Sequence, residues 1–496
     1  MPPIIELKGI EKKFVGVHAL KNVDFRVDVG EIRCLAGENG CGKSTLIKVI
    51  SGVYPKDAGT VFLNGNNYPL LNPLDSMREG IQVIYQDFSL FPNLTVAENI
   101  AFSSLVDDKD RLCDWKKVRR LADASLGRIK ADIDPKATVG DLPVADRQQV
   151  AIARALSANA RLVIMDEPTT ALTQREIDNL FKIVKDLTEQ NISVIFVSHK
   201  LREVLEICKT ITIMRNGEVV ADGGVEDFDE KKITCYMTGR ELGEEKFVYS
   251  PRPETTPVLR VENLQSGKEI QDISFLVMPG EILGVTGLLG SGRGELALAL
   301  FGLYPLDGGQ ILVDGQNLKL GSVEDAVKKG IGYIPEDRLT QGLFLNKSLA
   351  DNVSSTLLDT VKNRAGFLKI GELRRIASDI LASLQVKISS IDAPAATLSG
   401  GNQQRVVIGK WLAREPRLLI LNGPTVGVDV GSKQKIHERL RLLAEEGMGV
   451  IVISDDLPEI ASNCNRVLLV HKGRIVREFP MEHYGEADIS EEMRRL

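Results

Sequence analysis

The sequence predicts an α/β protein with two domains in tandem, and three observations lead to this prediction. The 496 residues exceed the length near which a single hydrophobic core stops growing, roughly 250 to 300 residues. The second half repeats the motifs of the first half in the same order. Within each half, apolar β-branched runs such as 162–165 and 194–197 alternate with amphipathic stretches. This pattern is typical of buried parallel strands covered by helices on both faces.

The repeat has a nearly constant spacing. The first copy reads VDVGEIRCLAGENGCGKSTL at 27–46, and the second reads VMPGEILGVTGLLGSGRGEL at 277–296, 250 residues later. Two later pairs, Asp166 with Asn422 and His199 with Asp455, are 256 residues apart. A spacing that grows once by six residues indicates one duplication with a small insertion.

A linker is expected between the two copies. The segment at 241–257 contains three prolines and no apolar periodicity. We therefore predict one domain at 4–240, the linker at 241–257 and the second domain at 258–496.

Composition and charge exclude some classes of function. The net charge is -6, from 62 basic and 68 acidic side chains. This weakly acidic balance argues against nucleic acid as a partner, because phosphate neutralisation dominates that affinity. The N-terminal residues lack an apolar signal core, and no apolar stretch approaches the roughly 20 residues that span a bilayer. We therefore expect the chain to remain in the cytoplasm.

The first copy contains a phosphate-binding loop. The segment GENGCGKST at 37–45 fits the pattern GxxxxGK[ST], follows a predicted strand at 32–36 and opens a predicted helix at Leu46. Glycines let backbone N–H groups surround phosphates, Lys43 offsets their charge, and the Ser44 hydroxyl reaches Mg²⁺. A purely structural turn is the alternative, which the strand, Lys-Ser-Thr and helix in this order disfavour. The predicted nucleotide-binding residues of the loop are Gly37, Glu38, Asn39, Gly40, Cys41, Gly42, Lys43, Ser44 and Thr45.

Two adjacent acids end the apolar strand predicted at 162–165. Burying two carboxylates there costs desolvation energy unless metal and water occupy the site. We predict that Asp166 holds the magnesium shell and that Glu167 orients or deprotonates the attacking water. His199 ends the next strand, where its imidazole could bond the γ-phosphate. A structural histidine is the alternative at that position.

Three further residues carry weaker signals. Gln86 follows a predicted strand at 81–85 and could touch both magnesium and the attacking water, although a polar residue leaving a strand is ordinary. Phe14 could stack on adenine or could be a buried core residue. Cys41 is expected to be a small residue that fits its loop, with its thiol open to alkylation when the site is empty.

The order of these motifs resembles the ATP-binding-cassette ATPase superfamily. With GLLGSGRGE at 287–295 and LSGGNQQ at 398–404, the duplicated chain resembles the fused ATPase subunit of bacterial monosaccharide importers of the ribose, galactose and xylose type. The resemblance implies two tandem P-loop cassettes, each with a RecA-like parallel-sheet core and a helical subdomain. It also implies head-to-tail pairing, in which each ATP lies between the phosphate loop of one cassette and the signature of the other.

Head-to-tail pairing would create two composite ATP sites, each made of residues from both cassettes. The first of these sites has every expected residue. It would join the loop and acids of the first copy to the second-copy signature at 398–402. Ser399 can cap the helix that follows, and two glycines let its N-terminal N–H groups approach the γ-phosphate. The expected signature residues that bind ATP are Ser399, Gly400, Gly401 and Asn402.

The second composite site has lost nearly every expected residue. Its partner signature at 142–146 reads LPVAD, which has a proline and an acid and lacks both glycines. We therefore expect one ATP to be hydrolysed per cycle, with Arg293 able to hold a second nucleotide as a structural clamp. The replacements in the second copy are Arg293 for Lys43, Gly294 and Glu295 for Ser44 and Thr45, Glu336 for Gln86, Asn422 for Asp166, Gly423 for Glu167 and Asp455 for His199.

The resemblance also implies partners and a location. ATP and Mg²⁺ are the expected cofactors, and the chain would lie peripherally on the cytoplasmic face of the plasma (inner) membrane. Two permease subunits would dock on 87–92 and 337–342, and an extracytoplasmic solute-binding protein would act indirectly. Phe88 and Phe91 would either meet the permease or pack inside the helical subdomain. The expected cargo is a sugar or sugar-like solute. The alternatives are import of nucleosides or of a sugar-like signal, and a soluble tandem-cassette ATPase acting on ribosomes.

Overall fold

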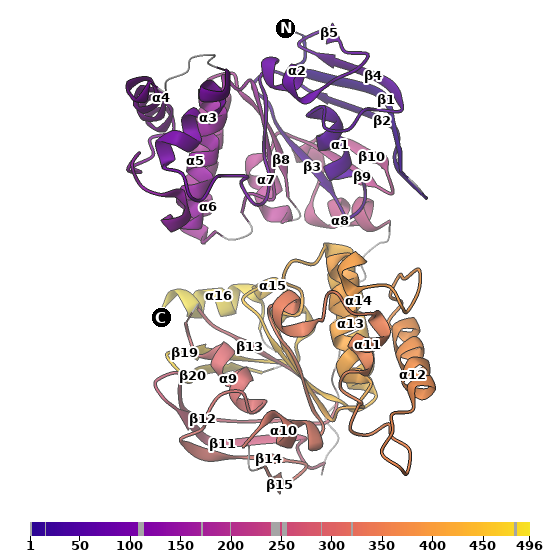
Figure 1. The fold of residues 1–496 in the computed structure, drawn as a ribbon. Helices are drawn as coiled ribbons and strands as arrows, with labels where there is room; N and C mark the ends of the chain where they lie inside the picture. Colours follow the sequence, from indigo (N-terminus) through magenta and orange to yellow (C-terminus); the bar gives the residue numbers. More distant parts are fainter. Residues whose placement is uncertain are drawn as a thin grey trace. The chain divides into compact units, whose positions relative to one another are not determined.

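The computed structural model contains two compact units, Met1–Leu242 and Gly243–Leu496, each described by itself (Figure 1). The residues that the structure describes are 2–14, 16–107, 114–169, 172–198, 200–239, 249, 255–288, 290–318, 321–480 and 484–496.

The first unit contains two sheets within its described residues. A four-stranded antiparallel sheet has the order β2-β1-β4-β5, and a six-stranded sheet has the order β10-β9-β3-β8-β7-β6. The six-stranded sheet is parallel except for β10, which pairs antiparallel with β9. The strands are β1 (Ile5–Phe14), β2 (Val17–Val27), β3 (Ile32–Gly37), β4 (Ala58–Leu63), β5 (Asn66–Asn67), β6 (Ile81–Ile84), β7 (Leu162–Asp166), β8 (Ser193–Val197), β9 (Thr210–Arg215) and β10 (Glu218–Gly224).

The helices of the first unit fall into two groups. Helices α3, α4 and α5 pack on one another and form a helical subdomain. The α1 helix packs between the two sheets, because Ile47 shares one core cluster with Leu7 of β1 and Leu35 of β3. The helices are α1 (Lys43–Ile50), α2 (Pro73–Arg78), α3 (Val96–Asp107), α4 (Trp115–Arg128), α5 (Val144–Ser157), α6 (Gln174–Glu189), α7 (Leu201–Ile207) and α8 (Glu230–Thr238), with short η1 (Val139–Asp141) and η2 (Val225–Asp227).

The second unit repeats this topology within its described residues. Its sheets have the orders β12-β11-β14-β15 and β16-β17-β18-β13-β19-β20, which match the first unit strand for strand. The strands are β11 (Leu259–Ser266), β12 (Ile270–Val277), β13 (Ile282–Thr286), β14 (Gly308–Val313), β15 (Gln316–Asn317), β16 (Ile331–Ile334), β17 (Leu418–Asn422), β18 (Gly449–Ile453), β19 (Arg466–His471) and β20 (Arg474–Phe479).

Helices of the second unit also repeat the first. Helices α11, α12 and α13 pack together as its helical subdomain. The helices are α9 (Arg293–Leu300), α10 (Val323–Lys328), α11 (Leu349–Ser354), α12 (Ile370–Ser383), α13 (Gly400–Leu412), α14 (Val430–Glu445), α15 (Leu457–Asn463) and α16 (Glu486–Arg494), with short η3 (Arg338–Gly342) and η4 (Ala395–Thr397). None of the helices in the described ranges is both long enough and apolar enough to cross a bilayer.

The central sheet of the second unit is buried on both faces. Alternate residues of β17 enter different core clusters, Leu418 and Ile420 in one, and Leu419 and Leu421 in the other. Successive strand residues point to opposite faces, so a continuous apolar run serves both cores. The predicted α/β fold with a parallel-sheet core and a helical subdomain is confirmed in each unit.

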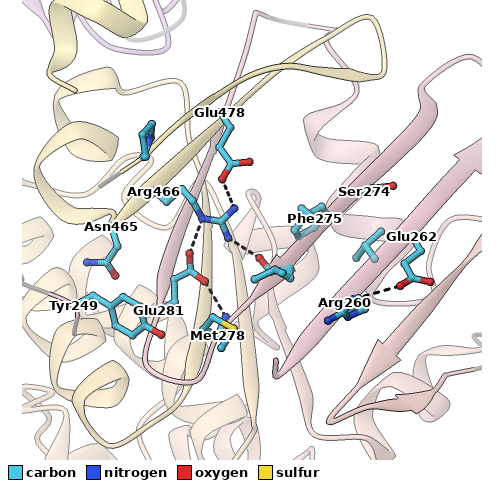
Figure 2. A pocket seen from close by; sticks show the side chains of 13 residues that line it. Tyr249, Arg260, Glu262, Ser274, Phe275, Met278, Glu281, Asn465, Arg466 and Glu478 are labelled. Atoms are coloured by element: carbon cyan, nitrogen blue, oxygen red, sulfur yellow. Dashed lines mark hydrogen bonds and ion pairs between the residues drawn. The ribbon is translucent and has the colours of Figure 1, made fainter. Parts of the chain in front are cut away.

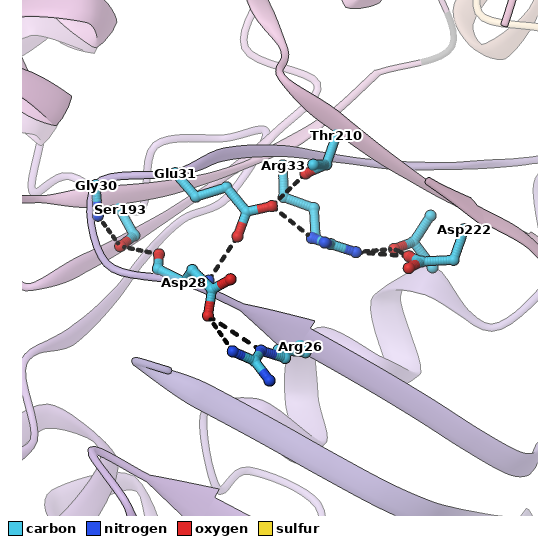
Figure 3. Close-up of polar contacts among 9 residues, drawn as sticks. Arg26, Asp28, Gly30, Glu31, Arg33, Ser193, Thr210 and Asp222 are labelled. Atoms are coloured by element: carbon cyan, nitrogen blue, oxygen red, sulfur yellow. Dashed lines mark hydrogen bonds and ion pairs between the residues drawn. The ribbon is translucent and has the colours of Figure 1, made fainter. Parts of the chain in front are cut away.

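Each unit contains a partly buried charge cluster where β3 or β13 begins. In the first unit, Arg33 of β3 donates to Glu31 (3.0 Å) and to Asp222 of β10 (Figure 3). In the second unit, Arg466 of β19 donates to Glu281 and Glu478, both at 2.8 Å (Figure 2). The carboxylates keep their places in the repeat, but the arginine does not.

The arginine has moved between neighbouring strands. Arg33 and Thr210 are register partners on β3 and β9, and Leu283 and Arg466 are register partners on β13 and β19. Thr210 stands at the position of Arg466, and Leu283 at the position of Arg33. The same three-charge cluster is therefore built from opposite members of one cross-strand pair.

Candidate active site

A cavity of about 620 Å³ in the first unit lies beyond the carboxyl ends of β3 and β7. Ligands of open parallel sheets bind at this edge. The cavity brings together ten of the predicted residues, which come from four separate segments of the chain. These are Phe14, Asn39, Gly40, Gly42, Lys43, Ser44, Thr45, Gln86, Asp166 and Glu167.

The loop between β3 and α1 needs glycine at two of its positions. Gly37 has φ 150° and Gly42 has φ 114°. A Cβ on Gly42 would lie 2.7 Å from the carbonyl oxygen of Ala19, so no other residue fits there without a shift of the backbone. Gly42 is also the N-cap of α1 and offers no side-chain cap. The first N–H groups of α1 therefore lack a side-chain cap and face the cavity, as a phosphate site requires.

Lys43 is buried and folds back on its own loop. Its Nζ donates to the carbonyl oxygens of Gly37 (2.6 Å) and Glu38 (3.0 Å). Both acceptors are neutral, so phosphate oxygens can replace them as stronger, charged acceptors. The Ser44 side chain beside it is exposed to the cavity.

Cys41 does not face the cavity. Its side chain is only 5% exposed and belongs to the core cluster that contains Met214. Burial raises the pKa of its thiol above the ordinary value. The expectation that this thiol is open to alkylation is therefore wrong, because the loop turns it inward against the sheet. Its small size fits the space beside Gly37.

The two acids at the end of β7 are held differently. Burial, and next the charge of Glu167, raises the pKa of Asp166. Glu167 has φ 49°, a left-handed conformation that is rare for a residue with a side chain, and its N–H donates to Val197 O at 2.9 Å. Such strain is concentrated at functional sites. Gly423, the counterpart of Glu167 in the second unit, has φ 59° and adopts the same conformation without strain.

Phe14 and Gln86 line the same cavity from separate segments of the chain. Phe14 ends β1 and is 41% exposed, with its ring edge-on to Tyr54 at 5.2 Å between centroids. It is therefore no core residue, and its exposed ring lines the cavity. Gln86 is exposed two residues after β6, which ends at Ile84. His199 lies outside the described residues.

Five residues of the cavity wall were not predicted. The most informative are Asn216 and Gly217, which connect β9 to β10 with φ 51° and 86°. The Gly217 N–H donates to Cys41 O at 2.9 Å, so this turn supports the phosphate loop. An Asn-Gly pair between two apolar runs is a strong hairpin signal and could have been used. The others are Val17, His18 and Ala19.

The segment at 398–402 begins a helix of the second unit. Ser399 occupies the N-cap position of α13 with an extended backbone, but its hydroxyl makes no cap bond to a backbone N–H. The Asn402 side-chain amide donates to that hydroxyl instead, at 3.0 Å. The expected Ser399 cap is therefore wrong. Gly400 and Gly401 allow close packing, because a Cβ on either one would collide with Arg338 or Ser432.

The family model described as "ABC transporter" matches residues 20–170 and 270–426 of the chain. The chain belongs to the ABC transporter family. The two matched segments lie one in each unit, so each unit is an ABC cassette. The resemblance drawn from the motif order is thus confirmed.

Curated relatives of this ABC chain share its full length. It is 43% identical to the ribose import ATP-binding protein RbsA of Chelativorans sp. (strain BNC1), over 98% of this chain and 95% of that protein. It is 41% identical to RbsA of Geobacillus kaustophilus (strain HTA426), over 95% of each. It is also 41% identical to a putative ribose/galactose/methyl galactoside import ATP-binding protein of Agrobacterium fabrum (strain C58), over 95% of this chain and 93% of that protein. The similarity therefore covers both cassettes.

Proposed function

We propose that the chain is the ATP-hydrolysing subunit of an importer that moves a sugar through separate membrane subunits. One observation carries the ATPase assignment: the first cassette gathers Lys43, Ser44, Asp166 and Glu167 around one cavity. The sugar assignment rests on the relatives, which are named for import of ribose or of ribose, galactose and methyl galactoside. These names favour neither a ribosomal role nor another cargo.

The predicted residues of the first cassette have separate roles in this proposal. The loop amides and Lys43 bind the phosphates, and Phe14 stacks on the adenine ring. Glu167 accepts a proton from the attacking water, and His199 bonds the γ-phosphate. Because Glu167 takes the proton of the attacking water, the amides of the phosphate loop can stabilise the negative charge that develops on the phosphate oxygens.

The residues present fit a magnesium ion brought by ATP. The Ser44 hydroxyl, Gln86 amide and Asp166 carboxylate line the same cavity, and Mg²⁺ prefers such oxygen ligands. Asp166 is partly buried, and desolvation raises the pKa of its carboxyl, so a nearby cation would stabilise its charge. When bound, the ion would neutralise charge on the phosphate oxygens.

We also propose that 398–402 of the second cassette completes the binding of this ATP. The first turn of α13 has no side-chain cap and no acidic residue, so its N–H groups suit a phosphate. The equivalent helix α5 of the first cassette has Pro143 at its N-cap and Asp146 in its first turn. A phosphate would be repelled there. One competent ATP site per chain follows.

One exposed apolar side chain in each of two segments suits the membrane subunits. Phe91 is 42% exposed beside Phe102, whereas Phe88 is half-buried. Leu339 in the equivalent segment of the second cassette is 45% exposed. We propose that two permease subunits dock on 87–92 and 337–342, with the chain peripheral at the cytoplasmic face of the membrane. The solute-binding protein would act through the permease.

Hydrolysis by the Glu167→Gln variant tests the catalytic assignment. Because a positioned base contributes about 10² to 10⁴ in rate, phosphate release from ATP should fall at least 100-fold. Binding of ATP should persist, since Gln keeps the shape of the side chain. The matched control is Glu336→Gln in the second cassette, which should hydrolyse ATP at the unchanged rate. An unchanged rate in Glu167→Gln would contradict the assignment.

Uptake tests the cargo separately. The chain, reconstituted in vesicles with a sugar permease and a solute-binding protein, should drive ATP-dependent uptake of labelled ribose or galactose. Co-sedimentation of the purified chain with ribosomes, and not with permease-containing vesicles, would overturn the importer assignment.

A further inference from the structure

The second cassette keeps a loop shaped like the phosphate loop, with Arg293 at the position of Lys43. Arg293 begins α9 and donates from Nη1 to the carbonyl oxygen of Gly287 at 2.7 Å. Lys43 makes the corresponding bond to Gly37. The backbone and the basic group of a phosphate site are therefore both present in this loop.

Arg293 differs from Lys43 in having a charged partner. Its Nη2 lies 3.3 Å from a carboxylate oxygen of Asp455, the residue that stands where the first cassette has His199. The Arg293 side chain is 15% exposed and that of Asp455 is 73% exposed. A carboxylate and a phosphate bind guanidinium through the same charged hydrogen bonds, so the two compete for Arg293.

The turn that carries Asp455 is fixed on both sides. The Ser454 hydroxyl donates to the buried Glu459 carboxylate at 2.7 Å. Asp456 caps α15 through the Glu459 N–H and accepts from Lys433 Nζ at 3.0 Å. These bonds hold the backbone of Asp455 beside α9. Its carboxylate therefore meets Arg293 without ordering a mobile loop, which lowers the entropy cost of the pair.

A second acidic residue of this loop, Glu295, also disfavours binding of a triphosphate. Glu295 lies in the first turn of α9, where Thr45 stands in the first cassette, and Gly294 replaces the Ser44 hydroxyl. A triphosphate on this loop would displace the Asp455 carboxylate and then face it and Glu295 as like charges. Both effects weaken binding.

We infer that the Arg293–Asp455 pair closes the second loop against nucleotide, with the Asp455 carboxylate occupying the guanidinium in place of a phosphate. Asp455 is then a specificity-determining residue that directs ATP to the first cassette. This deepens the proposed function, on which it rests, and replaces the expected role of Arg293 as a nucleotide clamp.

Equilibrium binding of ATP to the full chain tests the inference in a Lys43→Ala background, which removes the first loop's contribution. Lys43→Ala with Asp455→Asn should bind fluorescent ATP analogue about tenfold more tightly than Lys43→Ala alone. The gain combines an ion pair worth up to about 1 kcal/mol, roughly fivefold, with loss of one like charge. Lys43→Ala with Asp456→Asn is the matched control and should show no gain, because Asn also caps a helix.

Two results would overturn the inference. One is equal affinity of Lys43→Ala with and without Asp455→Asn. The other is no binding by the double variant at millimolar analogue while its melting temperature matches that of Lys43→Ala. Neither depends on hydrolysis, so a failure here is separate from a failure of Glu167→Gln to lose activity.

Discussion

Asp166 and Glu167 are adjacent in the chain but bear different physical costs. Asp166 bears an electrostatic cost, because burial and the charge of Glu167 raise its pKa. Glu167 bears a conformational cost, because its φ is 49°. Bound Mg²⁺ would relieve the first cost, whereas the second is independent of ligand. Substitutions at the two positions should therefore affect stability in different ways.

Replacing Asp166 by Asn should raise the melting temperature of the ligand-free chain at pH 7. A carboxyl whose folded pKa is raised destabilises the fold above that pKa, and the penalty vanishes below the unfolded value of about 3.9. The difference between the variant and the native chain should therefore shrink as pH falls through the raised pKa towards 4. Calorimetric melting across this range measures it.

The same Asp166→Asn variant should lose at least about 100-fold of its ATP hydrolysis, because a neutral amide holds Mg²⁺ poorly. Asn422→Asp, the reciprocal change in the second cassette, should leave hydrolysis unchanged. Lower stability of Asp166→Asn at pH 7 would contradict the assignment of a partly buried carboxylate whose pKa is raised.

For single residues, the sequence predicted which positions line the site better than it predicted where each side chain points. Ten predicted residues line one cavity because they sit at loop and strand ends, which the topology collects at one sheet edge. The predicted environments of Cys41 and Ser399 were wrong. Cys41 packs in the core that contains Met214, and the Ser399 hydroxyl accepts from the Asn402 amide. Such neighbours are distant or side-chain-specific, and periodicity does not reveal them.

Among the secondary-structure elements, the strands of the central sheets were the easiest to predict. The expected strand at 81–85 is β6, Ile81–Ile84, and the expected helix opening at Leu46 begins three residues earlier at Lys43. The antiparallel sheet was not predicted, although the burial of β1 alternates in the part that pairs with β4. Bulges between β1 and β2 interrupt that period and weaken the signal.

The displaced arginine allows a test of how the strands are held. Arg466→Thr leaves Glu281 buried without its guanidinium, which should destabilise the second cassette by about 3 kcal/mol. Adding Leu283→Arg recreates the arrangement of Arg33 in the first cassette and should recover part of the loss. Urea unfolding of the full chain measures both. A double variant less stable than Arg466→Thr alone would show that the two arrangements are not interchangeable.

For the whole molecule, the two cassettes share a fold but not a chemistry. The first has the phosphate loop, the acids and the strained turn, and the second has a capless α13 without an acid. Sequence comparison of the copies revealed this division, because Asn422 and Gly423 stand where the first copy has the acids Asp166 and Glu167. The closed state of the second loop was not predicted, since it depends on the contact of Arg293 with Asp455.

Exchanging one charge between the signatures should separate their contributions. Asn402→Asp places an acid at the start of α13, which favours the helix but repels phosphate, and should lower ATP hydrolysis by about tenfold. Asp146→Asn is the reciprocal change in the first cassette and should not alter the rate. Phosphate release by the full-length variants measures both. Equal effects of the two changes would contradict the assignment of a single competent site.

The displaced arginine also affects how the gene can change. Arg33 and Thr210 of the first cassette, and Leu283 and Arg466 of the second, are encoded on either side of any crossover that falls between these strands. One recombinant cassette would carry two arginines, and the other would have a buried glutamate and a half-exposed carboxylate with no guanidinium. Gene conversion that leaves one cassette with leucine and threonine at these two positions would thus remove the guanidinium beside a buried glutamate, and that product should fold poorly.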